Sequence, residues 1–319
     1  MGNNQEEKIK LRNKIMTVIG IMFSIIFMSI FLCWGGLNIA KFIVYNQFYK
    51  LSSDVASIPG IKDGFIASGI TYLNNDSSYA LVGSMNKNDD NKLYLVNSKN
   101  EMARYKLLSN GKEFKTNSTM DIAYVNNYIY LANEKSDSSL DDTYGIYRIN
   151  LDSLNESNGT IDIGARISTS INKCSFLFAD SSFIYVGETS ETSGNIVKYS
   201  VFDTTFATPL EIYKLSANVK GASFINEDEL VTISNIDFKD SYIEFYKLSE
   251  CVLSSSLSEG VITKVLPTPY KTIKGPMLLN GLDLNSTKEK VLIISTSGSS
   301  KYIFGSMFFS NKIRELTIS

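Results

Sequence analysis

The sequence predicts an all-β fold, a five-bladed β-propeller of four-stranded blades, preceded by one N-terminal transmembrane helix. Three observations support this prediction. Residues 15–40 form a stretch of 26 residues without a charge. Beyond them, short alternating strands rich in Tyr, Ile, Val and Phe are separated by Asn, Asp, Ser and Gly clusters, with no long helical period. Within that part, a four-residue pattern recurs five times, with starts separated by 52, 52, 48 and 60 residues.

The apolar stretch 15–40 is long enough to cross a bilayer, whose core requires about 20 apolar residues in a helix. In hydrocarbon, only a helix satisfies its own backbone within one segment. The residues before it carry four basic side chains, at Lys8, Lys10, Arg12 and Lys14. Positive charge at this end predicts a single-pass protein of the cell membrane, with residues 1–14 in the cytoplasm and the bulk of the chain extracellular.

A cleaved signal peptide is the alternative to an uncleaved anchor. Its apolar region covers about 7–15 residues and is followed by a small-x-small cleavage site. The stretch here is longer, and Asn38-Ile39-Ala40 is a poor match to such a site. We therefore expect the helix to remain as an anchor.

Charge and composition exclude several classes of function. Beyond the apolar stretch, 27 basic residues face 31 acidic ones, whereas a nucleic-acid-binding domain needs a basic surface. The chain contains no histidine, which removes Ser-His-Asp and Cys-His catalysis and a favoured zinc ligand. Cys174 and Cys251 could form one disulfide, but the sequence cannot show whether their Cα atoms approach closely enough.

Residues 41–57 are expected to form a juxtamembrane linker, and residues 58–319 the propeller. The recurring pattern is a variable residue, an apolar one, a small or polar one and then usually an aromatic. It occurs at Gly69–Tyr72, Asp121–Tyr124, Lys173–Phe176, Gly221–Phe224 and Gly281–Leu284.

A second strand follows each pattern after a turn and ends in a small residue and a polar one. These strands are Ala80–Ser84, Ile129–Asn133, Ile184–Glu188, Val231–Asn235 and Leu292–Thr296. A third strand follows a variable loop, for example Leu93–Val96 in the first unit and Tyr302–Phe304 in the last. A weaker fourth follows in some units, as at Glu211–Leu215.

Four strands per unit at this period are typical of propeller blades. The innermost strand lies at a crowded axis, which favours small residues such as Thr71, Ala123 and Ser223. Five units predict five blades, with six as the alternative, and the segment Ile58–Phe65 could pair with the last blade to close the ring. A β-sandwich has turns at similar spacing, but would not repeat four strands in phase.

The strands Ile129–Asn133 and Ile184–Glu188, each followed by a loop and another apolar strand, resemble the YVTN-type repeats of bacterial surface β-propellers. The resemblance covers the second strands of two or three units. The chain departs from that family in its longer period and in lacking a regular Asn after the strand. The resemblance implies a fold and a location at the cell surface, and no reaction.

The repeat indicates candidate ligand-binding residues near the axis. Asn133, Glu188 and Asn235 share one position, after the small residue that ends a second strand. Asp121 replaces the Gly of other units, and Asp283 replaces a Thr, Ala or Ser. A carboxylate near a crowded axis is costly unless it is paired, hydrated or bound to a cation. Alternatively, the two Asp residues satisfy backbone donors and Glu188 is solvated.

Two polar loops carry weaker signals. Asn86–Asn91 resembles a calcium loop but lacks the following Gly and the distant bidentate Glu, so we expect a hairpin tip. Lys135–Asp142 is an acidic, Ser-rich insertion.

The leading hypothesis is a non-catalytic extracytoplasmic binding or scaffolding propeller, with no cofactor, that binds a cell-surface protein, peptide or glycan. The alternative is a divalent-cation-dependent hydrolase or lactonase, in which calcium held by Glu188, Asp121 and Asp283 polarises a carbonyl or activates water. A third hypothesis is a structural subunit of an envelope complex, with contacts made by the apolar helix itself.

Overall fold

The chain folds into two compact units, residues Met1–Asn46 and Gln47–Ser319. The computed structural model describes residues 3–73, 78–85, 91–114, 120–133, 145–155, 158–168, 173–236, 239–254, 261–296 and 312–318. The loop 86–90 and the acidic insertion 135–142 lie outside these residues.

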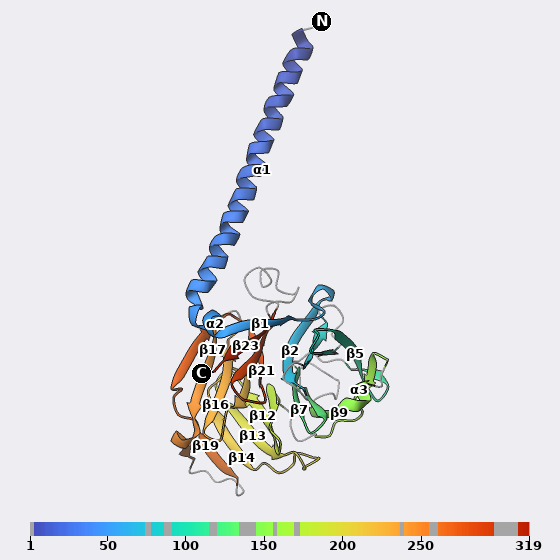
Figure 1. The fold of residues 1–319 in the computed structure, drawn as a ribbon, viewed down its shortest axis with the longest axis vertical. Helices are drawn as coiled ribbons and strands as arrows, with labels where there is room; N and C mark the ends of the chain where they lie inside the picture. Colours follow the sequence, from blue (N-terminus) through green and yellow to red (C-terminus); the bar gives the residue numbers. More distant parts are fainter. Residues whose placement is uncertain are drawn as a thin grey trace. The chain divides into compact units, whose positions relative to one another are not determined.

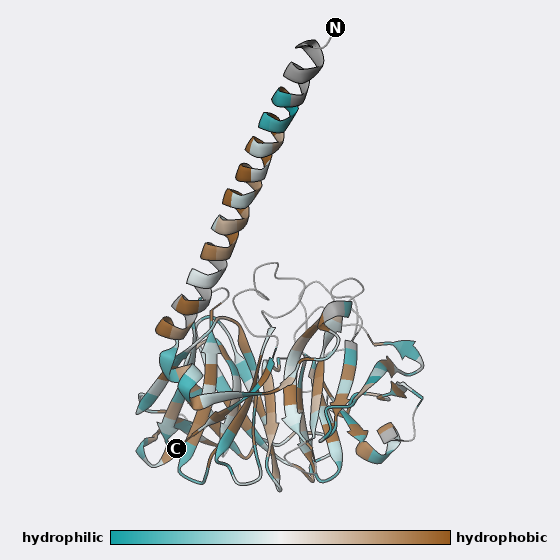
Figure 2. Cartoon of the chain, turned by 45° about the horizontal axis from the view of Figure 1, so that its top comes forward, coloured by the Kyte–Doolittle hydropathy of each residue, from teal (hydrophilic) through white to brown (hydrophobic). Residues whose placement is uncertain are grey.

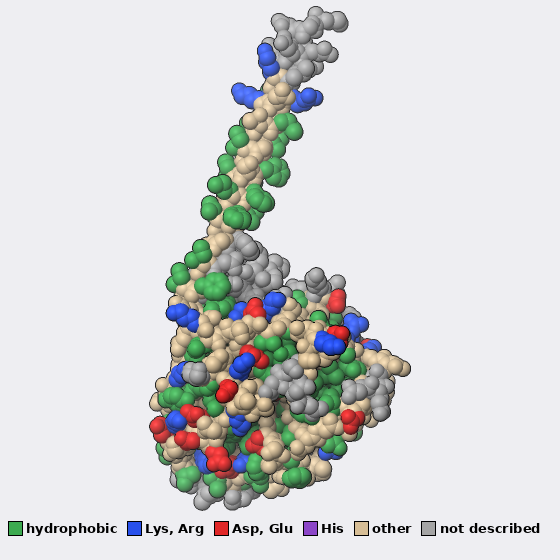
Figure 3. Space-filling model, viewed as in Figure 1, with side chains coloured by type: hydrophobic (Ala, Val, Ile, Leu, Met, Phe, Trp, Pro, Cys, Tyr) green, Lys and Arg blue, Asp and Glu red, His purple; other side chains and the backbone are tan. Residues whose placement is uncertain are grey.

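The first unit is one long helix, α1 (Asn3–Val44). Within it, Lys10–Leu32 is long and apolar enough to cross a membrane, and none of this stretch is buried against protein. Figure 2 shows the apolar residues along the middle of α1, and Figure 3 shows basic side chains near its N-terminal end. By length and composition alone, a signal sequence has the same properties.

The second unit contains five sheets, whose mainly antiparallel strands are here grouped as blades 1 to 5 (Figure 1). Blades 1 to 3 are built from strands that follow one another along the chain, whereas the outermost strands of blades 4 and 5 come from further along the chain and from its N-terminal part. From the inner strand outwards, blade 1 contains β2 (Phe65–Tyr72), β3 (Tyr79–Met85), β4 (Asn91–Val96) and β5 (Met102–Ser109), and blade 2 contains β7 (Met120–Val125), β8 (Tyr128–Asn133) and β9 (Gly145–Asn150). Blade 3 contains β11 (Phe176–Ala179), β12 (Phe183–Thr189), β13 (Gly194–Ser200) and β14 (Glu211–Leu215).

Blades 4 and 5 complete the ring. Blade 4 contains β15 (Val219–Phe224), β16 (Glu229–Asn235), β17 (Ser241–Lys247) and β20 (Lys271–Gly275), and blade 5 contains β21 (Leu279–Leu284), β22 (Lys290–Ser295), β23 (Lys312–Thr317) and β1 (Ser52–Ser57). The inner strands β2, β7, β11, β15 and β21 contact one another in a closed cycle. This arrangement confirms the predicted five-bladed propeller, although blade 2 has only three strands among the described residues.

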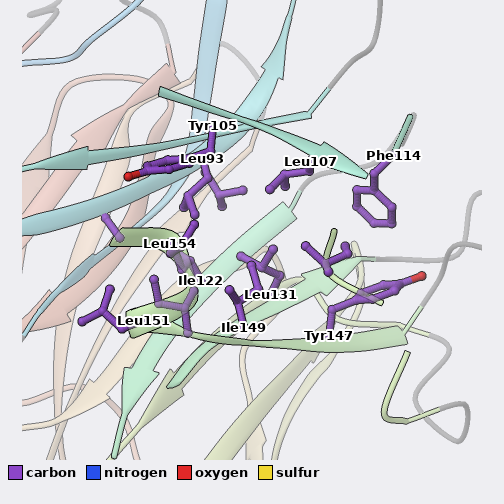
Figure 4. Close-up of a cluster of buried hydrophobic side chains, with 14 residues drawn as sticks. Leu93, Tyr105, Leu107, Phe114, Ile122, Leu131, Tyr147, Ile149, Leu151 and Leu154 are labelled. Carbon is purple, nitrogen blue, oxygen red and sulfur yellow. The ribbon is translucent and has the colours of Figure 1, made fainter. Parts of the chain in front are cut away.

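The hydrophobic core lies between neighbouring blades and not inside one sandwich. The cluster between blades 1 and 2 brings Leu93 and Leu107 against Ile122, Leu131 and residues around them (Figure 4). Equivalent clusters fill the spaces between blades 2 and 3, 3 and 4, and 5 and 1. Because successive side chains of a strand point to opposite faces, one blade contributes to the clusters on both of its sides.

The repeat is in phase in four units and out of phase in the third. Gly69–Tyr72, Asp121–Tyr124, Gly221–Phe224 and Gly281–Leu284 all lie within inner strands. In the third unit, Lys173–Phe176 precedes the inner strand, which begins at Phe176 and continues to Ala179. Lys173 therefore does not occupy the position of Asp121. Apolar residues alternate with other residues both in Cys174-Ser175-Phe176 and, with a second apolar face, in Phe176-Leu177-Phe178. Side-chain alternation alone therefore cannot decide which of the two segments forms the inner strand.

The ring closes through β1, whose residues Ser52–Ser57 pair antiparallel with β23. The sequence suggested the segment after it, Ile58–Phe65, for this role, and assigned residues 41–57 to a linker. Residues 41–57 contain the end of α1, the short helix α2 (Asn46–Leu51) and β1 itself. The expected third strand at 302–304 lies outside the described residues, and β23 takes its place beside β22.

Further short elements join neighbouring blades. Strand β10 (Thr160–Asp162), which follows blade 2, pairs in parallel with β5 of blade 1. Strand β19 (Ile262–Val265), which follows the third strand of blade 4, pairs in parallel with β14 of blade 3 and carries β18 (Val252–Leu253) on its outer side. The remaining elements are β6 (Lys112–Glu113), α3 (Leu151–Asn155) and two single turns, η1 (Ile61–Asp63) and η2 (Leu248–Glu250).

Candidate functional site

Asp121 lies near the start of the inner strand β7 and links blade 2 to blade 3. Its side chain is buried, and Oδ2 accepts the backbone N–H of Leu177 in β11 at 2.7 Å. Oδ1 has no hydrogen-bond partner among the described residues. On the other side lies Gly69 of blade 1, where a Cβ would collide with Oδ1 and with the backbone of Asp121. The carboxyl group is therefore enclosed by three blades.

This enclosure sets the protonation of Asp121. Burial raises the pKa of its carboxyl group to about 8, because the charged form loses hydration. The backbone N–H groups of Leu177 and Ile122 lower the pKa in part, and the negative charge of Asp283 raises it further. At neutral pH the native protein therefore favours the protonated form of Asp121.

Asp283 lies near the end of the inner strand β21 and links blade 5 to blade 1. Its Oδ2 accepts the Oγ1–H of Thr71 at 2.7 Å and the N–H of Tyr72 at 2.9 Å. Its Oδ1 accepts the N–H of Leu284 at 2.8 Å. Several donors thus surround this half-buried carboxylate, as the alternative interpretation of the sequence expected.

Asn235, the last residue of β16, links blade 4 to blade 5. Its Nδ2 donates to the backbone oxygen of Leu279 at 2.5 Å. It also borders a hollow of about 440 Å³ whose lining includes Asn218, Lys239 and Tyr242. Asn133, which ends β8 in blade 2, is buried at 1 % exposure. Hydrogen-bonding side chains therefore end the second strands of blades 2 and 4.

Sequence reasoning missed Thr189, which performs the role of Asn235 in blade 3. Its Oγ1 donates to the backbone oxygen of Val219 in blade 4 at 2.8 Å. Strands β12 and β16 have equal lengths and the same succession of buried and half-buried residues, which aligns Thr189 with Asn235. The sequence comparison had aligned Glu188 with Asn235, one residue too early.

Glu188 stands apart from the two axial Asp residues. It is half-buried, and burial raises the pKa of its carboxyl group while the charge of Lys173 lowers it. Among the described residues, no group of three or more His, Cys, Asp or Glu side chains is placed to hold a metal ion. The structure thus brings Asp121 and Asp283 to the inner strands, within electrostatic reach of each other, and does not gather them with Glu188 into a ligand cluster.

Cys174 and Cys251 do not form the disulfide that the sequence allowed. Cys174 is buried and Cys251 is half-buried, and neither forms a disulfide. The possible bridge between them is therefore absent. Each thiol occupies its own place, Cys174 between blades 2 and 3 and Cys251 after η2.

No family model and no curated protein sequence matches the chain. Solved structures with a similar fold include the following three proteins. The catalytic domain of a GH62 α-L-arabinofuranosidase from Coprinopsis cinerea is 10% identical at a TM-score of 0.41, over 83% of this chain and 95% of that one. The gluconolactonase XC5397 of Xanthomonas campestris is 9% identical at a TM-score of 0.39, and the match covers 83% of this chain and 88% of that one. The WD40 domain of coronin from Toxoplasma gondii is 8% identical at a TM-score of 0.39, and the match covers 85% of this chain and 75% of that one.

These similar structures are β-propellers. They include enzymes and a WD40 domain, and similarity at this level assigns no activity, ligand or partner to the present chain. The resemblance to YVTN-type repeats gains no support from a family match.

Proposed function

We propose that this chain is a membrane-anchored extracytoplasmic β-propeller that acts as a non-catalytic binding or scaffolding module at the cell surface. The observation that carries the proposal is the use of both axial carboxyl groups as links between blades. Asp121 accepts a backbone N–H of blade 3, and Asp283 accepts donors of blade 1. Groups engaged in this way stabilise the ring, and a rigid ring presents its loops and outer edges to a partner.

The anchor is supported by the first unit. Basic residues precede a stretch of α1 that could span a bilayer, and positive charge next to a span favours the cytoplasmic side. This orientation would place the propeller outside the cell. A partner at the cell surface would then meet the propeller without crossing the membrane.

The alternative, a cation-dependent hydrolase or lactonase, has one observation in its favour. A buried carboxyl group with a strongly raised pKa and an unpartnered oxygen, as at Asp121, is a feature that many catalytic acids share. The position of Gly69 argues for a packing role, because its backbone lies directly against that oxygen. We therefore propose the binding module first.

Intact bacterial cells that produce the full chain with a C-terminal epitope provide the test. We expect protease added outside to degrade the epitope, and a membrane-impermeant cross-linker to join the chain to the same neighbour in the wild type and in Asp121→Asn. As a control, a chain that ends after α1 should not be cross-linked to that neighbour. Protection of the epitope, or loss of the neighbour in Asp121→Asn alone, would contradict the proposal.

A further inference from the structure

A hollow of about 440 Å³ lies at the end of blade 4 where β16 ends and where β15 and β17 begin. Its lining comes from the residues that lead into β15, from the end of β16 and from the residues that lead into β17. Small-molecule sites in proteins have volumes of about 300–1,000 Å³. The hollow is therefore large enough for a small ligand, and its chemistry indicates which one.

Asn235 offers this hollow a hydrogen-bond acceptor. The residue is only 7% exposed, and its Nδ2 donates to the backbone oxygen of Leu279. Because that partner is a carbonyl oxygen, the amide nitrogen must face Leu279, which fixes the orientation of the amide group. No described residue donates to Oδ1, and this oxygen is not one of the fully enclosed atoms without a partner, so solvent reaches it. Oδ1 is thus a fixed acceptor with unused capacity.

Asn218 adds an amide group that can both donate and accept. Its backbone is held on two sides, because its N–H donates to Ser190 at 2.9 Å and its oxygen accepts the N–H of Asn235 at 3.2 Å. Its φ of 61° lies in the left-handed region, where Asn is several-fold enriched. None of the residues that the structure describes hydrogen-bonds its side chain. The fold therefore holds a second unused polar group beside Asn235.

Tyr242 and Ile236 supply apolar surface to the same hollow. Tyr242 is 41% exposed and is paired directly with Ser234 of β16 and Lys274 of β20, which fixes the face of the blade that it occupies. In the described part of the chain, no other ring packs on that of Tyr242. Ile236 directly follows Asn235 and is also exposed. The hollow thus combines an aromatic ring and an aliphatic side chain with free amide groups.

The charge at the hollow is positive. Lys239 is exposed and borders it, and no described carboxylate forms an ion pair with this residue. The neighbouring Asp240 is already paired with Lys274 at 2.6 Å. The carboxylate of Asp240 is therefore compensated, whereas the ammonium group of Lys239 is left to attract an anionic ligand.

An acidic sugar is the ligand that uses all of these groups. A pyranose ring has C–H groups on its faces, which pack on an aromatic ring, and hydroxyl groups at its edge, which donate to and accept from amides. A purely apolar ligand would leave the amide groups unpaired, and a simple anion would leave the ring of Tyr242 uncovered. The charge of Lys239 favours a sugar that carries a carboxylate.

We propose that the hollow of blade 4 binds a hexuronic acid unit of a cell-surface polysaccharide. The sugar ring packs on Tyr242 and Ile236, its hydroxyl groups bond to Asn218 and to Oδ1 of Asn235, and its carboxylate pairs with Lys239. This inference rests on the proposed binding function and names the class of ligand.

The test uses the full chain in nanodiscs of neutral lipid and the methyl glycosides of glucuronic, galacturonic and mannuronic acid. The matched neutral sugars are the methyl glycosides of glucose, galactose and mannose, which have a hydroxymethyl group in place of the carboxylate. By isothermal titration calorimetry we expect at least one hexuronide to bind, about fivefold or more tightly than its neutral counterpart. Acetate at the same concentration should not displace it, because acetate makes none of the ring contacts.

Substitutions in the protein locate the binding. Tyr242→Ala should weaken it about tenfold or more, because the apolar contact with the sugar ring is lost. Asn218→Gly keeps a residue that accepts a positive φ and removes only the amide, so we expect a loss of about fivefold, typical of one hydrogen bond. Lys239→Gln should reduce the affinity for the hexuronide to that of the neutral sugar, and should leave the affinity for the neutral sugar unchanged.

Matched changes elsewhere serve as controls. Phe202→Ala removes an exposed aromatic ring after β13 of blade 3, and Lys99→Gln removes an exposed positive charge from blade 1. Neither should change the affinity for the hexuronide. Circular dichroism checks that each variant is folded.

Several results would overturn the inference. These are binding of none of the three hexuronides, equal binding of the neutral sugars, displacement by acetate, and unchanged affinity in folded Tyr242→Ala and Asn218→Gly. Failure of the inference is distinct from failure of the proposed function. Cross-linking to the cell-surface neighbour that persists in Tyr242→Ala, without any hexuronide binding, would show a binding module that uses another surface.

Discussion

At the scale of single residues, Asp121 and Asp283 show one side-chain type joining blades in two electrostatic settings. Asp283 is half-buried and accepts hydrogen bonds from Thr71, Tyr72 and Leu284, donors that stabilise a charged carboxylate. Asp121 is buried, has one oxygen without a described partner and titrates at a pKa of about 8. Burial is therefore the main reason why the pKa of Asp121 lies far above the usual range of a carboxyl group.

The titration of Asp121 predicts how stability depends on pH. The pKa of its carboxyl group is near 3.8 in the unfolded chain and about 8 in the native protein. Between these values the unfolded chain releases the proton and the native protein keeps it, so the contribution to stability falls as pH rises through this window. The slope is on the order of 1 kcal/mol per pH unit and levels off above the native pKa.

Asp121→Asn tests this titration, because an amide oxygen still accepts the Leu177 N–H but does not ionise. We expect the variant to be more stable relative to wild type at pH 9 than at pH 5, because only the wild type loses stability as the pH rises. Urea unfolding followed by circular dichroism at pH 5, 7 and 9 measures this difference. Parallel pH profiles of the two proteins would show that Asp121 does not titrate in this range.

Removal of the Asp283 carboxylate should destabilise the ring. Asp283→Ala leaves the N–H of Tyr72 without its acceptor, and an unsatisfied buried donor costs about 1–3 kcal/mol. The matched change Glu188→Ala removes a half-buried carboxylate whose burial already raises its pKa, so we expect at most a small effect. Urea unfolding at pH 7 provides both values, and equal effects would contradict the assigned role of Asp283.

At the scale of elements, the segment between α1 and the first blade is part of the propeller. Phe48 of α2 is completely buried, and the guanidinium of Arg314 in β23 lies 5.9 Å from the centre of its ring and 4.9 Å from that of Tyr49. Arg314 also pairs with Asp54 of β1 at 2.7 Å. An aromatic residue, a cation and a strand pairing thus fix this segment to blade 5.

Truncation should separate the roles of α1 and β1. We expect a chain that lacks residues 1–45 to fold as a soluble propeller, because α2 and β1 are retained. A chain that lacks residues 1–57 loses β1, which pairs with β23 over Ser52–Ser57, and exposes the edge of β23. We expect it to aggregate or to melt at a clearly lower temperature. Circular dichroism and size-exclusion chromatography compare the two, and equal melting temperatures would contradict the role of β1.

At the scale of the whole molecule, the absence of histidine from the sequence means that the response to pH near neutrality depends on carboxyl groups with raised pKa. Histidine is the side chain that ordinarily changes charge between pH 5 and 8. With no histidine in the sequence, the carboxyl group of Asp121, whose pKa burial raises to about 8, is left to respond near that range. The pH response of this chain is therefore expected to arise inside the propeller.

Calcium tests the alternative function of the whole molecule. Since the described residues provide no cluster of three metal-ligating side chains, we expect millimolar calcium and a chelator to give the same melting temperature. Differential scanning fluorimetry of the full chain, with Glu188→Ala as the comparison, measures this directly. A calcium-dependent rise in melting temperature that Glu188→Ala abolishes would restore the cation-dependent hydrolase as the leading hypothesis.

Particular residues show which features of the propeller could be predicted from sequence patterns and which could not. The pattern at Gly69–Tyr72 located an inner strand because alternation and turn residues are local properties. The same reasoning misplaced the inner strand of blade 3, where two registers around Phe176 alternate equally well. It nominated Asp121 and Asp283 because each departs from its repeat, but it could not distinguish a ligand site from a link between blades. It missed Thr189 because a one-residue shift hides the equivalence with Asn235.

The sequence by itself determined the apolar helix, the short alternating strands and the recurrence of a blade-sized unit, because each depends on residues close together in the chain. Only the tertiary structure decided which strand closes the ring and what the axial carboxyl groups contact. Asp121 meets Leu177 across 56 positions, and Asp283 meets Tyr72 across 211. Such contacts depend on how blades pack around the axis, and no local pattern records which backbone donors that packing brings to a carboxylate.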